Sequence, residues 1–292
     1  MIVPSGSGVN GIARILHEAG IIASPLVFQI GVRLKRFDKD LRAGEYLFPA
    51  KISAFDAARH LRSGKTVIRR LTMAEGLTSK EMLTELGRAE GLFGDTVQAG
   101  PIAEGELLPE TYHFSYGDSR VSIVRRMRQG MAETLRTLWA SRAPGLPLQT
   151  PREALILASI VEKETGVPEE RTRVAGVFIN RLNKGMRLQS DPTVVYAVSG
   201  GDGPLARPLT RADLERPSPY NTYLHSGLPP GPICNPGRAA LEAVMHPVRT
   251  DELYFVADGS GGHVFARTLK EHNRNVARWR RLKAQNGLEN RK

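Results

Sequence analysis

The most constraining feature of the sequence is an apolar run at residues 154–161, which lies inside a strongly signalled helix. Thr150 is a typical helix N-cap, Pro151 suits the first helical position, and Glu153 completes the pattern of a capping box. The Gly-Val-Pro sequence at 166–168 predicts where this helix ends. Because such a helix is apolar nearly all round, other elements must cover it, and the chain must build a core around it.

Two glutamates close this helix, Glu162 and Glu164, with Lys163 between them. Leu157 and Ile160 precede Glu164 by seven and four residues, so the three share one stripe and Glu164 points toward apolar surroundings. Burial and the negative end of the helix dipole both raise a carboxyl pKa, and a carboxylic acid that stays protonated near neutral pH can act as a general acid. Glu162 faces elsewhere. In the alternative interpretation both glutamates are solvated at the helix end, and this segment alone does not decide between the two.

The bulk composition is that of a folded protein with a basic surface. With 292 residues, of which 41% are apolar, the chain is long and apolar enough for two or three small domains. Its 41 Lys and Arg against 30 Asp and Glu give a net charge of +11, which favours a polyanionic partner. Nucleic acid, an anionic membrane surface and an acidic polymer all fit this charge, and so does a protein whose surface is simply basic.

Several kinds of chemistry and location are disfavoured. The one cysteine, Cys234, excludes a disulfide within the chain, and its loop-like setting favours an incidental role over that of a nucleophile. No Cys and His residues have zinc-binding spacing, so we expect no metal and no cofactor. No run reaches the roughly 18 apolar residues of a membrane span, because the nearest one, 21–32, is interrupted by Pro25. No signal peptide is present either.

The pattern of periodic segments and turns predicts an α+β fold in three parts. Residues 1–65 are expected to form a strand, two helices, a second strand and a third helix. Residues 66–149 contain a strand, a short helix, a loop-rich stretch, a long basic helix over 120–140 and a linker. Residues 150–292 hold the most motifs and are the expected catalytic part.

Polar groups gather after the buried helix. A second helix opens at Pro168 and forms a helical hairpin with the first. Gln189 and Ser190 precede a short helix that starts at Asp191. Tyr, Asn and Thr cluster on the Pro- and Gly-stiffened loop at 219–233, which suits a sugar because aromatic faces stack on pyranose rings and amides bind hydroxyl groups. Alternatively, this loop is a connector whose tyrosines pack inward.

Two further elements follow this loop. Residues 253–257 and 263–266 flank an Asp-Gly-Ser-Gly-Gly turn, which is a clear hairpin signal. A basic helix then runs from Leu269 to about Gln285, and we expect it to dock on the domain with its charged face in solvent. Phosphate binding by the Arg-Trp-Arg-Arg cluster at 278–281 is the less favoured alternative.

Long motifs occur in order through most of the chain. They include Ala-Ser-Ile-Val-Glu-Lys-Glu-Thr at 158–165, Met-Arg-Leu-Gln-Ser-Asp-Pro-Thr at 186–193 and Gly-Leu-Pro-Pro-Gly-Pro-Ile at 227–233. Shorter motifs stand at 104–112, 177–182, 220–223 and 254–257. In content and order these segments resemble the YceG/MltG family of endolytic murein transglycosylases.

The resemblance implies a domain organisation and a catalytic residue. It places a LysM-like peptidoglycan-binding module in residues 1–65, and in residues 150–292 a mixed α/β catalytic domain related to the lysozyme-like transglycosylases. Residues 66–149 would form a second small α/β unit and the long helix. In the lysozyme-like group the catalytic acid is a Glu followed by Ser or Thr, so Glu164 with Thr165 fits and Glu162 does not.

The implied reaction is endolytic cleavage between N-acetylmuramic acid and N-acetylglucosamine in nascent glycan strands, which leaves 1,6-anhydro ends. Glu164 would protonate the glycosidic oxygen and then, as the carboxylate, take the proton of the C6 hydroxyl that attacks C1. Because this internal hydroxyl replaces water, one glutamate suffices where most glycosidases need two carboxylates. The residues expected to bind substrate are Glu110, Tyr112, Thr165, Gln189, Ser190, Asp191, Tyr220, Asn221, Thr222 and Tyr223.

The resemblance also implies a location and partners. Members of the family begin with a membrane helix, so we expect such an anchor ahead of residue 1, in the inner membrane, with the catalytic domain in the periplasm. Peptidoglycan strands and membrane-bound cell-wall synthases are the expected partners. The alternative function is a non-catalytic peptidoglycan-binding scaffold of the synthesis machinery. Nucleic-acid binding is suggested by charge alone and has no recognisable motif, so we expect no nucleic-acid partner.

Overall fold

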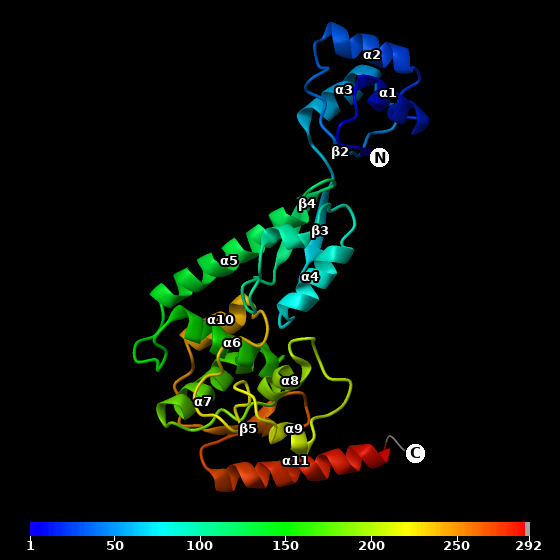
Figure 1. The fold of residues 1–292 in the computed structure, drawn as a ribbon. Helices are drawn as coiled ribbons and strands as arrows, with labels where there is room; N and C mark the ends of the chain where they lie inside the picture. The colour runs from blue at the N-terminus through cyan, green and yellow to red at the C-terminus, as the bar shows by residue number, and fades with distance from the viewer. Residues whose placement is uncertain (290–292) are drawn as a thin grey trace. The chain divides into compact units, whose positions relative to one another are not determined.

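The computed structural model describes residues 1–289 as a mixed α+β chain with helices and three separate two-stranded antiparallel sheets (Figure 1). The expected α+β class is confirmed. The chain divides into two compact units, and the predicted division at residues 65 and 149 stays a prediction. The first unit contains Met1–Thr72, Leu86–Gln98 and Thr111–Ile123, and the second contains Met73–Glu85, Ala99–Glu110 and Val124–Lys292.

The first unit opens with a strand, two helices, a strand and a third helix. These elements are β1 (Ile2–Val3), α1 (Val9–Glu18), α2 (Pro25–Leu34), β2 (Gly44–Glu45) and α3 (Ala54–Ser63), and β1 pairs with β2. The Ser24 hydroxyl accepts a hydrogen bond from Val27 N at 3.4 Å and caps α2. The Ser53 hydroxyl accepts from Asp56 N at 3.0 Å and caps α3. Gly64 ends α3 in the left-handed conformation, with φ of 66°.

A small core lies between these three helices. Phe28 and Val32 of α2, Leu16 of α1 and Leu61 of α3 are almost completely buried and belong to one cluster. Tyr46 follows β2 and is buried with them, and its hydroxyl donates to Arg42 O at 2.8 Å. The helices therefore cover the short β1–β2 pair, which has too few residues to be stable alone.

A second antiparallel pair completes the first unit. It joins β3 (Ile68–Thr72) to β4 (Thr111–Ser115), with Leu71 opposite Tyr112. Arg69 Nε donates to Glu45 Oε2 at 2.7 Å and links β3 to β2. The sequence pattern predicts a loop-rich stretch here and misses β4, because five alternating residues between turns give only a weak strand signal. The other elements before the second unit's core are α4 (Ser79–Arg88), the 3₁₀ helix η1 (Thr96–Ala99) and α5 (Arg120–Ala140).

The second unit is built around α6 (Pro151–Glu164). Its remaining elements are η2 (Pro168–Glu170), α7 (Arg171–Asn183), α8 (Asp191–Ser199), α9 (Arg211–Leu214), α10 (Arg238–Met245), β5 (Tyr254–Ala257), β6 (His263–Ala266) and α11 (Leu269–Glu289). Residues 154–161 are all buried, and α6 packs against both α7 and α10. Thr150 caps α6 as expected, accepting from Glu153 N at 3.2 Å. The Glu153 carboxylate accepts instead from Gln149 N at 2.6 Å, so the reciprocal bond of the predicted capping box is displaced by one residue.

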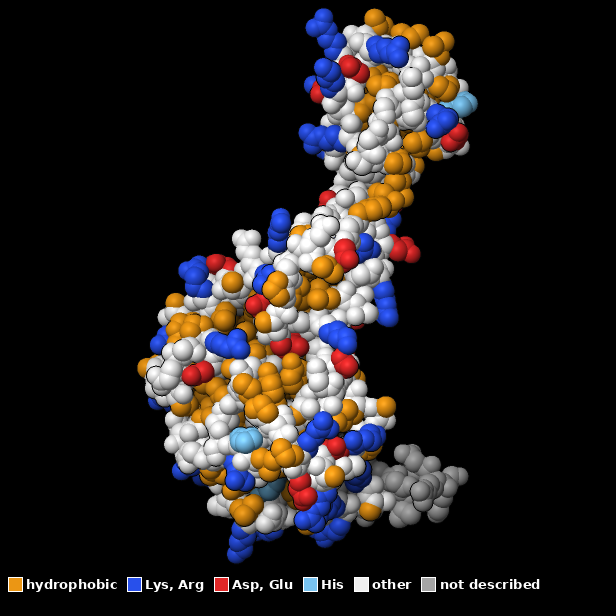
Figure 2. Space-filling view, viewed as in Figure 1, with side chains coloured by type: hydrophobic (Ala, Val, Ile, Leu, Met, Phe, Trp, Pro, Cys, Tyr) orange, Lys and Arg blue, Asp and Glu red, His pale blue; other side chains and the backbone are white. Residues whose placement is uncertain are grey.

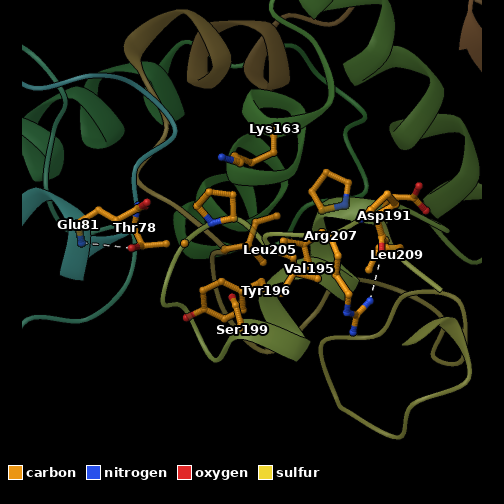
Figure 3. A pocket seen from close by; sticks show the side chains of 15 residues that line it. Thr78, Glu81, Lys163, Asp191, Val195, Tyr196, Ser199, Leu205, Arg207 and Leu209 are labelled. Carbon is orange, nitrogen blue, oxygen red and sulfur yellow. Dashed lines mark hydrogen bonds between the residues drawn. The ribbon is translucent and has the colours of Figure 1, made fainter. Parts of the chain in front are cut away.

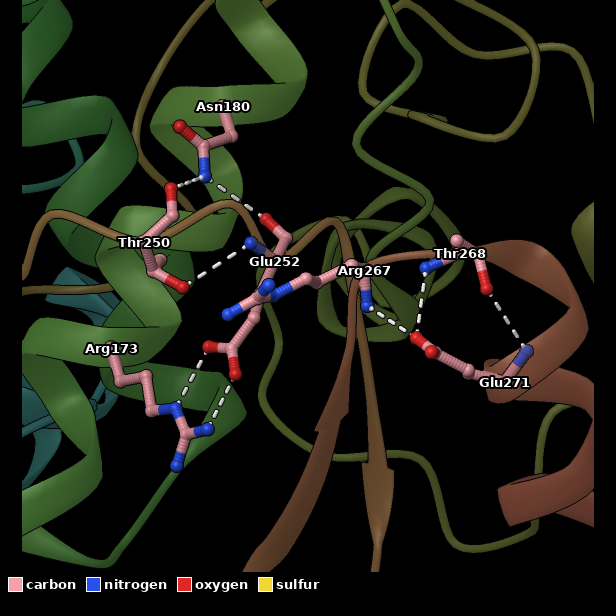
Figure 4. A network of polar contacts seen from close by, with 7 residues as sticks. All are labelled: Arg173, Asn180, Thr250, Glu252, Arg267, Thr268 and Glu271. Carbon is pink, nitrogen blue, oxygen red and sulfur yellow. Dashed lines mark hydrogen bonds and ion pairs between the residues drawn. The ribbon is translucent and has the colours of Figure 1, made fainter.

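Strands β5 and β6 pair as an antiparallel hairpin, as predicted, and polar contacts hold the segment that leads into it against α7 (Figure 4). Arg173 forms a two-pronged ion pair with Glu252, in which Nε donates to Oε2 at 2.8 Å. Asn180 Nδ2 donates to the carbonyls of Thr250 at 2.6 Å and Glu252 at 3.0 Å. The Glu271 carboxylate accepts from Thr268 N at 3.3 Å at the start of α11. The segment before β5 and the first turn of α11 are thus both held by specific bonds.

Truncation of a side chain at the centre of α6 tests how much this core contributes to the free energy of unfolding. Leu157 is fully buried, so Leu157→Ala should lower the free energy of unfolding of the second unit by about 2–5 kcal/mol. Leu224→Ala, in a loop of the same unit where the side chain is exposed, should cost less than about 1 kcal/mol. Urea unfolding measures both values, and equal losses would contradict the central role of α6.

Candidate active site

The last residue of α6, Glu164, lies in the wall of a cavity of about 500 Å³. The helix stops there because Thr165 adopts an extended backbone with φ of −140°. The cavity wall combines the end of α6 with α7, the segment after it, the strand β5 and the helix α11. Its lining side chains are Glu164, Arg181, Leu188, Gln189, Asp191, Tyr223, Tyr254, Phe255, Val256, Leu269, His272, Asn273 and Val276.

The surroundings of Glu164 keep its carboxyl group easy to protonate. The pKa of Glu164 is raised to about 7, mainly by burial, and the charge of the neighbouring Asp191 acts in the same direction. The Ser190 hydroxyl donates a hydrogen bond to Glu164 Oε1 and lowers the pKa, and the charges of His263 and Arg181 also lower it. Burial outweighs these effects, so protonated and ionised forms coexist near neutral pH.

A buried hydroxyl cluster holds Ser190 against Glu164. Ser190 is 1% exposed, and its backbone N donates to Thr222 Oγ1 at 3.0 Å. Thr193 Oγ1 donates to Ser190 O at 2.7 Å and lies 2.8 Å from Thr222 Oγ1. Gln189 before it has a φ of 50°, a left-handed conformation that residues other than glycine rarely adopt. The hydrogen bonds among Ser190, Thr193 and Thr222, together with the left-handed backbone of Gln189, therefore fix the position of the Ser190 hydroxyl.

A second carboxylate in the cavity belongs to Asp191. The Tyr223 hydroxyl donates to Asp191 Oδ1 at 2.6 Å. Burial is the first cause that raises the pKa of Tyr223 above its ordinary value, and this hydrogen bond adds to it. Arg187 Nη1 donates to Tyr223 O at 3.1 Å and holds the backbone of this loop. The tyrosine thus stays a hydrogen-bond donor, and it fixes the direction of the aspartate.

Sequence reasoning missed one side of the cavity, which Arg181, Tyr254 and His272 form. Arg181 is buried, and it donates to Leu253 O at 2.7 Å and to Leu188 O at 2.6 Å. Its guanidinium carbon lies 5.2 Å from the centre of the Tyr254 ring, and His272 stacks on Tyr254 at 5.2 Å. His272 Nδ1 is buried without a hydrogen-bond partner among the described residues. The one available signal was an arginine on the apolar stripe of α7.

Thr165 and Glu170 organise the turn after α6. Thr165 is 3% exposed, and its hydroxyl accepts from Val167 N at 3.1 Å and donates to Glu170 Oε2 at 3.4 Å. The Glu170 carboxylate also accepts from His263 N at 2.8 Å and is hydrogen-bonded to His263 Nδ1 at 2.7 Å. This network connects the turn to β6, so Thr165 supports the position of Glu164 without lining the cavity.

Glu162 is buried at a different place, as its position in the helix predicts. Its Oε2 accepts from Gly237 N at 2.9 Å, and Arg171 Nη2 lies 3.8 Å from Oε1. Burial raises the pKa of Glu162 as well. It does not line the cavity of Glu164 in the described part of the chain.

The residues expected to bind substrate therefore fall into distinct places. Gln189, Asp191 and Tyr223 line the cavity with Glu164, while Ser190 and Thr222 lie buried at its edge. Five remain, of which Thr165 lies in the turn after α6. Asn221 is 1% exposed and donates to Leu214 O and Arg216 O, and Tyr220 packs against Tyr196 at 4.9 Å. Glu110 is exposed, and Tyr112 is buried on β4 of the first unit. Their contact with substrate stays a prediction.

A second cavity, of about 390 Å³, also has Asp191 in its wall (Figure 3). Its other lining residues are mostly apolar and come from α8 and from the loop at 203–209. Two cations also line it: Lys163, whose Nζ donates to Gly76 O at 3.1 Å, and Arg207, which pairs with Asp213 at 2.5 Å. Asp191 therefore lines both the cavity that contains Glu164, whose wall is mixed polar and apolar, and a more apolar one.

Two further features are absent from the described residues. No group of three or more His, Cys, Asp or Glu side chains is arranged to hold a metal ion within residues 1–289. Within the same residues no helix has the length and apolar character that a membrane crossing requires.

The fold and the cavity define a class of protein: a mixed α+β domain in which a buried carboxylic acid with a pKa of about 7 faces a cavity lined by polar and apolar side chains. Such a group is suited to general acid–base chemistry. The sequence model of the YceG-like family matches residues 1–278, and the chain belongs to this family. The resemblance seen in the motifs is thereby confirmed.

Individual relatives agree with this assignment. An endolytic murein transglycosylase of Bacillus subtilis (strain 168) is 33% identical over 93% of this chain and 82% of its own length. One of Streptococcus pneumoniae (strain R6) is 32% identical over 94% of this chain, which spans 57% of that relative's length. The crystal structure of a YceG-like protein of Listeria monocytogenes has a TM-score of 0.57 at 30% identity and covers 94% of this chain and 97% of its own.

The opposing effects of burial and of the Ser190 hydroxyl on the pKa of Glu164 can be measured directly. Ser190→Ala removes a donor that favours the carboxylate, so the pKa of Glu164 should rise above its value of about 7. NMR titration of labelled glutamate side chains reports this pKa. Ser199→Ala on α8, whose hydroxyl accepts from Gly201 N, is the matched control and should leave the pKa of Glu164 unchanged. A fall of this pKa in Ser190→Ala would contradict the assignment.

Proposed function

We propose that this protein is an endolytic lytic transglycosylase of peptidoglycan, with Glu164 as its single acid and base. The observation that carries the proposal is the buried carboxyl of Glu164, whose pKa of about 7 permits both protonation states in one catalytic cycle. The relatives named as endolytic murein transglycosylases supply the substrate class.

The proposed reaction begins with the protonated acid. Glu164 donates its proton to the glycosidic oxygen between N-acetylmuramic acid and N-acetylglucosamine, the bond from C1 to this oxygen breaks, and positive charge develops at C1. The carboxylate of Glu164 then accepts the proton of the muramyl C6 hydroxyl, and the C6 oxygen bonds to C1. The product is a 1,6-anhydro ring, and Glu164 is protonated again, so the cycle closes without water.

The groups around the cavity suit the other needs of this reaction. The Ser190 hydroxyl stabilises the ionised form of Glu164 and thus favours the first proton transfer. The Asp191 carboxylate, oriented by Tyr223, is available to oppose the positive charge at C1. Gln189, Tyr254 and His272 supply polar and aromatic surfaces for sugar rings. One carboxylate would be enough for proton transfer, because the nucleophile is part of the substrate.

We further propose that residues 1–65 are a LysM-like module that binds glycan strands. The strand–helix–helix–strand order of residues 2–45 and the antiparallel pairing of β1 with β2 support this. The protein would then act outside the cytoplasm on the cell wall, from an anchor in the inner membrane. Membrane-bound cell-wall synthases are its proposed partners.

The decisive experiment compares the wild type with Glu164→Gln on purified glycan strands. The amide cannot donate the proton, so cleavage should fall by about 100-fold or more. Mass spectrometry of the wild-type products should show 1,6-anhydro ends, which are lighter than hydrolysed ends by one water. Glu162→Gln, two residues away in the same helix, is the matched control and should retain cleavage. Reducing ends from the wild type, or cleavage by Glu164→Gln, would refute the mechanism.

The proposed binding module has its own test. Deleting residues 1–65 should weaken sedimentation with insoluble peptidoglycan by about tenfold, because the remaining unit keeps only its own contacts with the strand. Circular dichroism and the urea midpoint of the second unit serve as controls for folding. Unchanged sedimentation of a folded deletion variant would count against a LysM-like role.

A further inference from the structure

Helix α2 lacks the polar face that a surface helix normally has. Its sequence is Pro-Leu-Val-Phe-Gln-Ile-Gly-Val-Arg-Leu, in which Gln29 and Arg33 are the polar residues. Phe28 and Val32 are each 1% exposed and pack into the core of the first unit. A helix that is apolar all round is normally covered all round. Within the described chain α2 is covered on the side of this pair, where it packs against α1 and α3.

The opposite side of α2 presents an apolar stripe to solvent. Leu26, Val27, Ile30 and Leu34 are 63%, 60%, 49% and 78% exposed. Because an α-helix turns by about 100° per residue, these four side chains share one stripe, which lies opposite the buried pair. Figure 2 shows apolar side chains gathered over α2, at the top of the view. Single exposed apolar residues are ordinary, but a contiguous stripe marks an interaction surface.

Basic residues border this stripe. Arg33, Lys35, Arg36 and Lys39 are exposed, and within residues 1–289 none of them forms an ion pair. The ring of Phe55, which is 44% exposed, lies 5.9 Å from Lys35 Nζ at the same end of α2. Two acidic residues stand in this stretch, Asp38 and Asp40, and Asp40 is paired with Arg62 at 3.2 Å.

We propose that the outward face of α2 binds the surface of an anionic lipid bilayer. An aliphatic stripe beside unpaired cations is the arrangement of an interfacial helix, which buries its apolar side at the boundary of the acyl chains while basic residues meet anionic headgroups. A glycan strand offers carboxylates and hydroxyls but no aliphatic layer, so it matches the cations and leaves the stripe uncovered. A protein partner or a second copy would cover the stripe but gives no particular role to the cations.

Sedimentation with lipid vesicles tests this surface in the full chain. The wild type should bind vesicles of equimolar phosphatidylcholine and phosphatidylglycerol, bind phosphatidylcholine alone much less, and be released by salt. The double variant Leu26→Ser, Ile30→Ser should bind about tenfold or more weakly. Val97→Ser is the matched control, because Val97 is 77% exposed on η1, and it should bind like the wild type.

The contribution of the cations needs a charge-matched comparison. Arg33→Gln, Lys35→Gln and Arg36→Gln together should weaken binding on the order of a hundredfold at low salt. The same three-charge change at Arg278, Arg280 and Arg281, on the exposed side of α11, should have a much smaller effect. Unchanged urea midpoints would show that the exposed substitutions leave the fold intact.

Two results would overturn the proposal. One is equal vesicle binding by the wild type and the α2 variants. The other is a wild type that does not bind vesicles but self-associates in sedimentation velocity, while the double variant Leu26→Ser, Ile30→Ser is a monomer. That result would show that the stripe binds a second copy of the chain. Neither result depends on the role of Glu164, because cleavage of glycan strands is measured without lipid.

Discussion

The burial of α6 on all sides is the constraint on which the second unit depends. Residues 154–161 carry no polar side chain except Ser159, whose hydroxyl is satisfied by Ile156 O at 2.7 Å. The unit must therefore wrap α7, α10 and the loop around Ile233 over this helix. A helix enclosed in this way has little freedom to shift, so its last residue, Glu164, is held at a defined position in the cavity wall. The precision of the site follows from the packing of the core behind it.

Placing a carboxyl group at the end of such a helix has an energetic consequence. The pKa of Glu164 is about 7 in the folded protein and 4.5 as its ordinary value, so between these pH values the folded state binds the proton that the unfolded state releases. This group therefore favours folding when protonated, and its contribution is lost as pH rises through this window. Ser190 limits the loss by bonding the ionised form. The hydroxyl cluster of Ser190, Thr193 and Thr222 thus contributes to stability as well as to the proposed proton transfer.

Local signals in the sequence predicted much of this arrangement. The cap at Thr150, the apolar stripe of α6 and the Asp-Pro start of α8 each act within a few residues, and the structure reproduces all three. Contacts between distant segments were not predictable in the same way. His263 is 93 residues from Glu170, and His272 reaches the cavity only because α11 packs against the β5–β6 hairpin. Nothing in the basic sequence of α11 distinguishes the turn that meets the cavity from those that face solvent.

The same limit explains which expectations about polar residues remain open. Tyr, Asn and Thr at 220–223 suit a sugar by residue type, but Asn221 and Thr222 also suit a loop that must satisfy its own backbone. In the structure Asn221 bonds to backbone carbonyls and Thr222 to Ser190, whereas Tyr223 lines the cavity. Residue type gives the chemistry that a side chain can perform, and packing decides which side of the loop it faces.

Two places where the described part of the chain departs from ordinary patterning have a proposed functional interpretation. In α6 an apolar helix ends in a charge that stays buried, and in α2 an apolar helix continues onto a face that stays exposed. Both departures lower the stability of the isolated chain, since one desolvates a carboxylate and the other leaves apolar area in water. A folded protein keeps such features when a bound partner or a reaction uses them. For Glu164 the proposed use is a proton that leaves and returns near pH 7. For α2 the proposed use is binding to a lipid surface, which would remove the apolar stripe from water.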